Sequence, residues 1–235
     1  MSQSRFPAFH EVELPFGNDH AERRVSIFLP PGFQREAGTY PVVFCADGGS
    51  VPAFGMRMTR AMRDGLVPAT ILIGVHNSPD ARAEEYLPGV DRERFDAHAE
   101  FFSRTVVDWA HAELDLPADP RSTAVFGVSN GGAFAIAMGL LHPGQFGNVI
   151  AFSVAKSPTR PPLQTSRPDS LPRFYMAAGR TGRENSFRRH TAALAKILQR
   201  RGIDCTYSAK EGDHDFEFWQ SELPAALNWV FGSTR

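Results

Sequence analysis

Short apolar segments alternate along the chain with segments of helical spacing, and this order predicts the fold class. Two early segments alternate apolar and polar residues, as half-buried strands do, and later ones are continuous apolar runs typical of strands buried on both faces. Strands are expected at residues 10–16, 23–30, 41–46, 70–75, 123–127, 148–154, 173–178 and 204–209. Helices are expected at residues 54–63, 96–114, 131–141 and 187–201, with a last one running through Trp229. The order predicts an α/β fold with one mostly parallel sheet of about eight strands, flanked by helices.

Two polar stretches interrupt this order. Residues 76–95 are polar and broken by Pro and Gly, which predicts a long loop, and residues 157–172 form a Pro-rich linker. The part of the chain after that linker is too short to be a domain of its own. Residues 1–235 are therefore expected to form a single domain without a large separate cap domain.

Composition and charge then narrow the class of protein. Hydrophobic residues make up 42% and charged residues 22%, which excludes disordered, collagen-like and coiled-coil chains. With 25 Lys and Arg against 26 Asp and Glu, no basic surplus favours nucleic acid or an anionic membrane as a partner. The start of the chain lacks a signal-peptide pattern, and no apolar run approaches the ~20 residues of a membrane span. A cytoplasmic protein is expected.

The two cysteines, Cys45 and Cys205, lie far apart in apolar runs. They form no disulfide framework and no CxxC pattern, so neither a zinc nor a redox site is expected. The sequence predicts no cofactor and no metal, and it leaves the oligomeric state open.

The sharpest motif is Gly127-Val128-Ser129-Asn130-Gly131, which fits the pattern G-x-S-x-G. It follows an apolar strand and precedes an apolar helix, the setting in which a tight turn presents a nucleophilic serine at the edge of a sheet. Side chains at the two glycines would collide with the neighbouring strand and helix. Ser129 is therefore the expected nucleophile, and the alternative is a glycine-rich turn with a capping serine.

A serine nucleophile needs a base, which on this architecture follows it in the chain. Of the three histidines downstream, His142 lies at a helix end before proline, and His190 lies inside a helix among polar residues. His214 lies in the loop after the last strand, and this loop is expected at the same edge of the sheet as Ser129. His214 is therefore the expected base; the alternative is an ordinary loop histidine.

The acid that orients the base is expected after the strand at residues 173–178, next to the histidine loop. That loop holds one carboxylate, Glu184, which would fix the tautomer of His214 and stabilise its positive charge. The alternative is a glutamate favoured in the first turn of a helix. Asp213 and Asp215 also remain candidates for the acid, although direct sequence neighbours of a histidine rarely have the geometry to orient its imidazole.

An oxyanion formed at this site needs two N–H donors. Asn130, directly after the nucleophile, is expected to supply one of them. The turn after residues 41–46 is placed to supply the other through Gly48 or Gly49, where glycine lets the backbone approach a substrate closely. The alternative is an ordinary tight turn.

These motifs together resemble the putative esterase family of α/β-hydrolases, which includes enterochelin esterases, esterase D, and feruloyl and acetylxylan esterases. The similarity extends over roughly residues 25–231 and looks strongest to the enterochelin esterases at residues 82–102, GVSNGGAFA and HPGQFGNVIAFS. In that branch a tryptophan follows the histidine by five residues, as Trp219 follows His214 here. Many relatives have Asp soon after the position of Gly179, some use a Ser–His dyad, and longer members carry an extra N-terminal domain.

The resemblance implies a serine hydrolase that cleaves small-molecule carboxylic esters. An acyltransferase on the same fold and a catalytically silent binding homologue remain open as alternatives. A metallohydrolase is disfavoured, because the sequence lacks a second cluster of metal ligands at usable spacing. Arg82, Tyr86 and Trp219 are the expected substrate contacts. The loop that holds Arg82 and Tyr86 also offers Arg92, Arg94 and Phe95. The alternative for the loop is that Arg–Glu pairs pin it in place.

Overall fold

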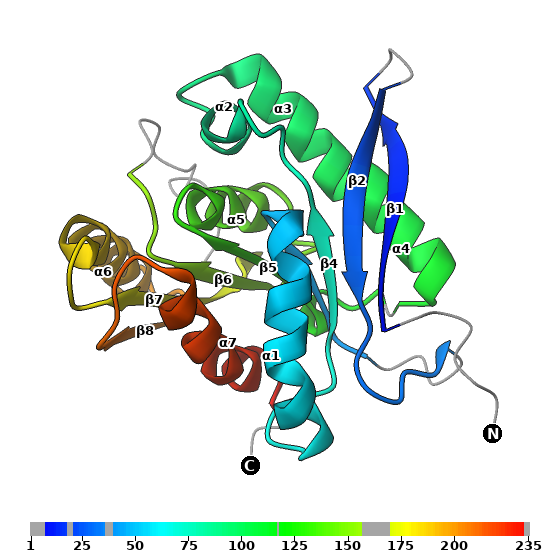
Figure 1. Cartoon of the computed structure of the whole chain (residues 1–235). Helices are drawn as coiled ribbons and strands as arrows, with labels where there is room; N and C mark the ends of the chain where they lie inside the picture. Colours follow the sequence, from blue (N-terminus) through cyan, green and yellow to red (C-terminus); the bar gives the residue numbers. More distant parts are fainter. Residues whose placement is uncertain (1–7, 18–20, 36–39, 117, 157–169, 233–235) are drawn as a thin grey trace.

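In the computed structural model, residues 8–17, 21–35, 40–116, 118–156 and 170–232 are described. Eight strands form one sheet in the order β1-β2-β4-β3-β5-β6-β7-β8 (Figure 1). The first two pairings, β1 with β2 and β2 with β4, are antiparallel, and all others are parallel. The strands are β1 (Phe9–Phe16), β2 (Ala21–Phe28), β3 (Val42–Cys45), β4 (Ile71–Val75), β5 (Thr123–Val128), β6 (Asn148–Phe152), β7 (Arg173–Gly179) and β8 (Cys205–Lys210). The predicted α/β fold with a mostly parallel sheet is confirmed.

Helices cover both faces of the sheet. Two of them, α1 and α7, lie together on one face, and the others pack on the opposite face (Figure 1). The helices are α1 (Val51–Arg63), α2 (Arg82–Tyr86), α3 (Arg92–Glu100), α4 (Val107–Leu114), α5 (Asn130–Leu141), α6 (Glu184–Arg200) and α7 (Phe216–Phe231). A π-helical turn, η3 (Phe101–Val106), joins α3 to α4, and 3₁₀ turns lie at η2 (Gly48–Ser50) and η4 (Pro120–Ser122).

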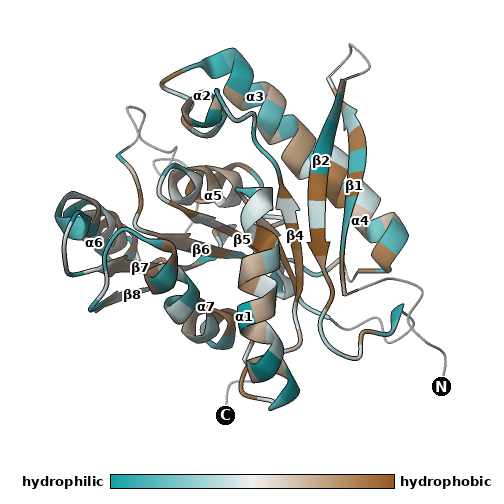
Figure 2. Ribbon diagram, in the orientation of Figure 1, coloured by the Kyte–Doolittle hydropathy of each residue, from teal (hydrophilic) through white to brown (hydrophobic). Residues whose placement is uncertain are grey.

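The central strands explain why both faces must be covered. In β3, the side chains of Val42 and Phe44 point to one core, and those of Val43 and Cys45 point to the other. Alternate residues of a strand face opposite sides, so a strand without polar residues has no face to offer to water. The ribbon is accordingly apolar along the inner strands, and the polar colours gather on the outer surfaces of the helices (Figure 2).

The stretch predicted to be one long loop differs from that expectation. Within residues 76–95 the chain forms the short helix α2 and the start of α3, which begins at Arg92 rather than near residue 96. The side chain of Asp91 caps α3 by accepting the N–H of Arg94 at 3.0 Å. The prediction missed these helices because Pro88 and Gly89 interrupt the spacing. The predicted Pro-rich linker lies mostly outside the described residues.

No helix within the described ranges is long and apolar enough to span a membrane. Cys45 and Cys205 are both free thiols, and burial raises the pKa of the Cys205 thiol to about 12.

Candidate active site

The turn between β5 and α5 holds Ser129 in a strained backbone conformation, with φ 57° and ψ −121°. A side chain at Gly127 would place its Cβ 2.0 Å from the Gly131 carbonyl oxygen. At Gly131, a Cβ would lie 3.1 Å from the Cβ of Ala46 in the neighbouring turn. The sequence GVSNG therefore allows a turn that other residues would block, and this turn presents Ser129 at the carboxyl edge of the sheet.

His214 lies in the loop between β8 and α7 and faces Ser129. Its Nε2 lies 3.1 Å from Ser129 Oγ, and its Nδ1 lies 3.0 Å from Glu184 Oε1. A carboxylate can only accept, so Nδ1 carries the proton and Nε2 is left to accept the hydrogen of the serine hydroxyl. The imidazole thus links the serine to the carboxylate in the tautomer that a general base requires.

Glu184 is the first residue of α6, which begins three residues before the expected start at residue 187. Its side chain is fully buried. Glu184 Oε1 accepts from two groups, His214 Nδ1 and the hydroxyl of Ser153, the latter at 2.5 Å. A carboxylate at this depth is stabilised by such donors and by the amino end of its helix.

The two aspartates beside His214 hold the backbone of its loop. The Asp213 carboxylate accepts the N–H groups of His214 and Arg183, both at 2.7 Å, and these bonds lower the pKa of Asp213. Asp215 caps α7 by accepting the N–H of Phe218 at 2.9 Å. Glu184, and neither aspartate, is the carboxylate at Nδ1.

Two aromatic side chains enclose the imidazole. Phe187 stacks on it with ring centroids 3.8 Å apart and an angle of 23°, and Trp219 meets it edge-on at 5.1 Å and 87°. The Trp219 indole N–H donates to Ser153 Oγ at 2.9 Å. Trp219, predicted as a substrate contact, therefore lies beside His214, and its polar atom is engaged within the protein.

The two sets of predicted oxyanion donors lie at the same sheet edge. Asn130 begins α5, and Gly48 and Gly49 lie in η2, directly after β3. Gly48 is buried so tightly that a Cβ would come within 2.5 Å of both the Gly74 oxygen and the His76 ring, while Gly49 is exposed. The preceding residue, Asp47, has a φ of 60°, and its carboxylate would lie 2.9 Å from a Cβ at Gly131, so this turn lies against the turn of the nucleophile.

Arg82 and Tyr86 do not stand free in a substrate site. The Arg82 guanidinium binds the Asp47 carboxylate through Nε and Nη2, at 2.5 and 2.7 Å, and also reaches the Val128 carbonyl at 3.2 Å. Tyr86 is fully buried, stacks on Phe134 and accepts the N–H of Asp47 at 2.7 Å. The prediction of Tyr86 as a substrate contact is therefore wrong, because its ring belongs to the core.

Ion pairs fix the rest of this segment, as the alternative for the loop proposed. Arg94 pairs with Glu84 at 3.1 Å, and Arg23 on β2 pairs with the buried Glu85 at 2.7 Å. Arg92 pairs with Asp96 one turn along α3. Phe95 is buried. The segment therefore holds the turn at Asp47 in place through Arg82 and Tyr86.

Tyr86→Phe should lower both stability and the rate of ester hydrolysis. The change leaves the N–H of Asp47 without its acceptor, which costs about 1–3 kcal/mol for a buried donor and loosens the turn carrying Gly48. Urea unfolding and kcat measure the two effects. Tyr40→Phe is the matched control, because Tyr40 accepts the N–H of Gln34 at an exposed site. An unchanged kcat in Tyr86→Phe would show that the position of this turn does not affect catalysis.

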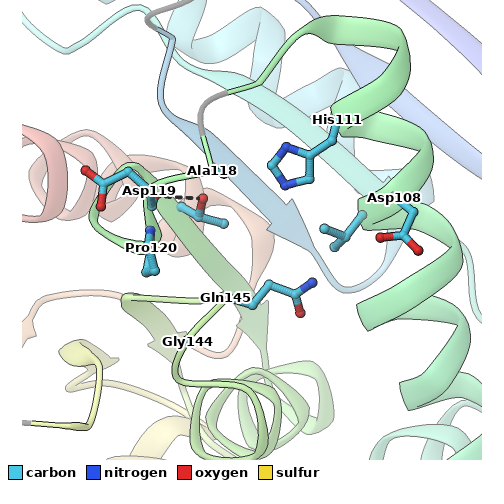
Figure 3. Close-up of a pocket in the computed structure, with 9 residues that line it drawn as sticks. Asp108, His111, Ala118, Asp119, Pro120, Gly144 and Gln145 are labelled. Carbon is cyan, nitrogen blue, oxygen red and sulfur yellow. Dashed lines mark hydrogen bonds between the residues drawn. The ribbon is translucent and has the colours of Figure 1, made fainter.

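Figure 3 shows a separate hollow of about 270 Å³, and none of the active-site residues described above lines it. It is lined by the α4 residues Asp108 and His111 and by Gln145, near the amino end of β5. The six residues of β5 separate it from Ser129 by roughly 20 Å. It takes no part in the site described here.

Sequence reasoning missed Ser153, Phe187 and Asp47. Each contacts a candidate site residue through folding and not through any motif, although Ser153 and Asp47 share one signal. Ser153 directly follows β6, and Asp47 lies two residues after the end of β3. Both positions are at the edge of the sheet where Ser129 and His214 were expected.

Comparisons with known proteins show the family and the fold of the chain. The profile of the Putative esterase family matches residues 20–230 of the chain. An acetyl esterase from Caldicellulosiruptor saccharolyticus is 25% identical over 178 residues, which cover 60% of this chain and 66% of that protein. Among solved structures, a ferulic acid esterase superposes with a TM-score of 0.76 at 18% identity, covering 94% of this chain and 97% of the other.

The enterobactin esterase FES from Shigella flexneri, solved in the presence of enterobactin, superposes with a TM-score of 0.75 at 20% identity. The superposition covers 97% of this chain but only 59% of that longer protein. The family match extends over most of the chain, and these folds share its sheet of helix-flanked strands. The chain therefore belongs to the Putative esterase family of α/β-hydrolases and is a carboxylic ester hydrolase.

Proposed function

We propose that the protein hydrolyses small-molecule carboxylic esters through an acyl-enzyme on Ser129, with His214 as general base and Glu184 as the acid that orients it. One observation carries the proposal: hydrogen-bonding distances run unbroken from Glu184 Oε1 through both imidazole nitrogens to Ser129 Oγ. The strained turn at Ser129 adds support, because backbone strain persists only where the surrounding structure enforces it.

In the first half of the reaction, Ser129 Oγ attacks the ester carbonyl carbon while its proton passes to His214 Nε2. The negative charge moves to the carbonyl oxygen, where the N–H of Asn130 and that of Gly48 or Gly49 would stabilise it. The imidazolium formed at the same moment faces the carboxylate of Glu184. Collapse of the intermediate expels the alcohol, which takes the proton from Nε2 and leaves an acyl group on the serine.

In the second half, water takes the place of the alcohol. His214 Nε2 removes a proton from the water as the water oxygen attacks the acyl carbon, and the carboxylic acid departs as the serine regains its proton. Both halves need the same base and the same oxyanion donors. One arrangement of side chains therefore serves both steps.

A panel of p-nitrophenyl, feruloyl and catecholate esters, assayed on wild type and Ser129→Ala, tests the proposal. We expect the wild type to hydrolyse at least one class and the variant to hydrolyse none above its buffer blank. Equal turnover by both proteins would exclude Ser129 as the nucleophile. Addition of alcohols to the assay, with esters as products, would instead favour acyl transfer.

A further inference from the structure

A buried serine outside the proposed triad, Ser153, is bound to the turn that carries the nucleophile. It follows β6 and has a φ of 48°, an uncommon value for a residue other than glycine. Two residues within two positions of it are tied to Ser129: the Ser129 N–H donates to the Phe152 carbonyl, and the Ala155 N–H donates to the Ser129 carbonyl, both at 3.0 Å. The backbone around Ser153 is thus fixed to the nucleophile itself.

The same turn is anchored to the helix that carries Glu184. The N–H of Val154 donates at 2.9 Å to the hydroxyl of Thr191, a buried residue of α6. Ser153 therefore spans the two elements whose separation decides whether a serine, a histidine and a carboxylate can line up.

The Ser153 side chain uses this position to make two hydrogen bonds. Its hydroxyl donates to Glu184 Oε1 at 2.5 Å and accepts from the Trp219 indole N–H at 2.9 Å. Ser153 and Glu184 are both fully buried, so water does not compete for these bonds. The oxygen that Ser153 contacts is the same one that accepts from His214 Nδ1.

We propose that Ser153 and Trp219 are positioning residues for ester hydrolysis: they hold the Glu184 carboxylate, and through it His214, in line with Ser129. This inference rests on the proposed function. A glutamate has several rotatable bonds, and a single donor would leave its carboxylate free to turn away from the imidazole. The second donor fixes Oε1, and Trp219 fixes the direction in which that donor points.

The network also has an electrostatic effect. The Ser153 O–H directs its positive end at Oε1 and so weakens the negative potential that His214 meets there. Removal of the hydroxyl strengthens that potential and favours the imidazolium. The acidic limb of the kcat/KM profile should therefore move to higher pH.

Other charged groups around the pair stay the same when Ser153 or Trp219 is replaced. Asp213 interacts with His214 and with Arg183 in the adjoining loop. Tyr207 on β8 interacts with Glu184 and also with Arg180 and Arg188. A shift of the limb in these variants can therefore be assigned to the network.

Ser153→Ala, Trp219→Phe and the double variant test the proposal. We expect Ser153→Ala to lower kcat on the order of 10- to 100-fold, as loss of an outer partner does for other histidine–carboxylate pairs, with KM unchanged. Its acidic limb should move to higher pH. Trp219→Phe should move the limb in the same direction by less, and should add nothing once Ser153 is alanine.

Matched controls separate positioning from packing. Ser103→Ala removes another buried serine hydroxyl, which bonds Ala99 on α3, and Trp229→Phe changes another tryptophan of α7. Both should leave kcat and its pH profile as in the wild type. The downfield proton resonance of His214 Nδ1–H adds a readout that needs no substrate, and it should shift in Ser153→Ala and in Trp219→Phe.

The outcomes distinguish this inference from the proposed function. An active wild type, an inactive Ser129→Ala and a Ser153→Ala variant with wild-type kcat, pH profile and Nδ1–H resonance would overturn the positioning role alone. Turnover by Ser129→Ala would overturn the proposed function, and the resonance would still decide whether Ser153 holds the pair. If Ser153→Ala does not fold, Trp219→Phe decides through the same two readouts.

Discussion

Ser129→Ala and His214→Ala should each abolish ester hydrolysis while the fold stays intact. Each removes one member of a unit in which the nucleophile cannot act without the base. In a serine protease the loss of either residue costs about 10⁶-fold in kcat, and we expect a loss of that order here. The residual rate would come from the oxyanion donors and from binding.

The double variant should be no slower than the single ones, because the second replacement removes a group that already has nothing to act on. Ser221→Ala and His142→Ala serve as controls, since one lies on the exposed side of α7 and the other caps the end of α5. Thermal unfolding should show all five variants folded. Near wild-type turnover by Ser129→Ala or His214→Ala would contradict the serine mechanism.

Glu184→Gln should lower kcat by about 10⁴-fold, the loss seen for the equivalent change in a serine protease, and change KM far less. A neutral amide no longer stabilises the imidazolium, and it can present an N–H to Nδ1 and so favour the wrong tautomer. The effect belongs to the transition state, where the positive charge forms.

Glu222→Gln is the matched control, because Glu222 is another buried glutamate, held by the Tyr175 hydroxyl at 2.5 Å and by Lys210 at 2.7 Å. It should affect stability but not kcat. A loss of only a few-fold in Glu184→Gln would mean that the enzyme works as a Ser–His dyad. In that case the role of the Glu184 carboxylate would be to stabilise the amino end of α6 through the helix dipole.

The order of strands and helices follows from the sequence because it depends on local patterns. Continuous apolar runs such as Val42–Cys45 are typical of a strand covered on both sides. Once the sheet is parallel, Ser129 and His214 share an edge because each lies in the connection that follows a strand ending there. Glu184 shares that edge for the same reason.

The parts that could not be predicted depend on contacts between distant segments. Tyr86 lies in a polar stretch, yet it is buried because Phe134 of α5 covers its ring. Arg82 has the composition of a substrate contact, but Asp47, 35 residues earlier, binds its guanidinium. Ser153 meets Glu184 across 31 residues, and no spacing rule connects them.

The most direct test of the central claim is covalent labelling with an organophosphonate, followed by peptide mapping. Only an activated serine reacts with such a reagent at neutral pH. We predict one adduct per chain, on the peptide that contains Ser129, with loss of labelling in Ser129→Ala and a much slower reaction in His214→Ala. An adduct on a different serine, or none on an enzyme that still hydrolyses esters, would contradict the account.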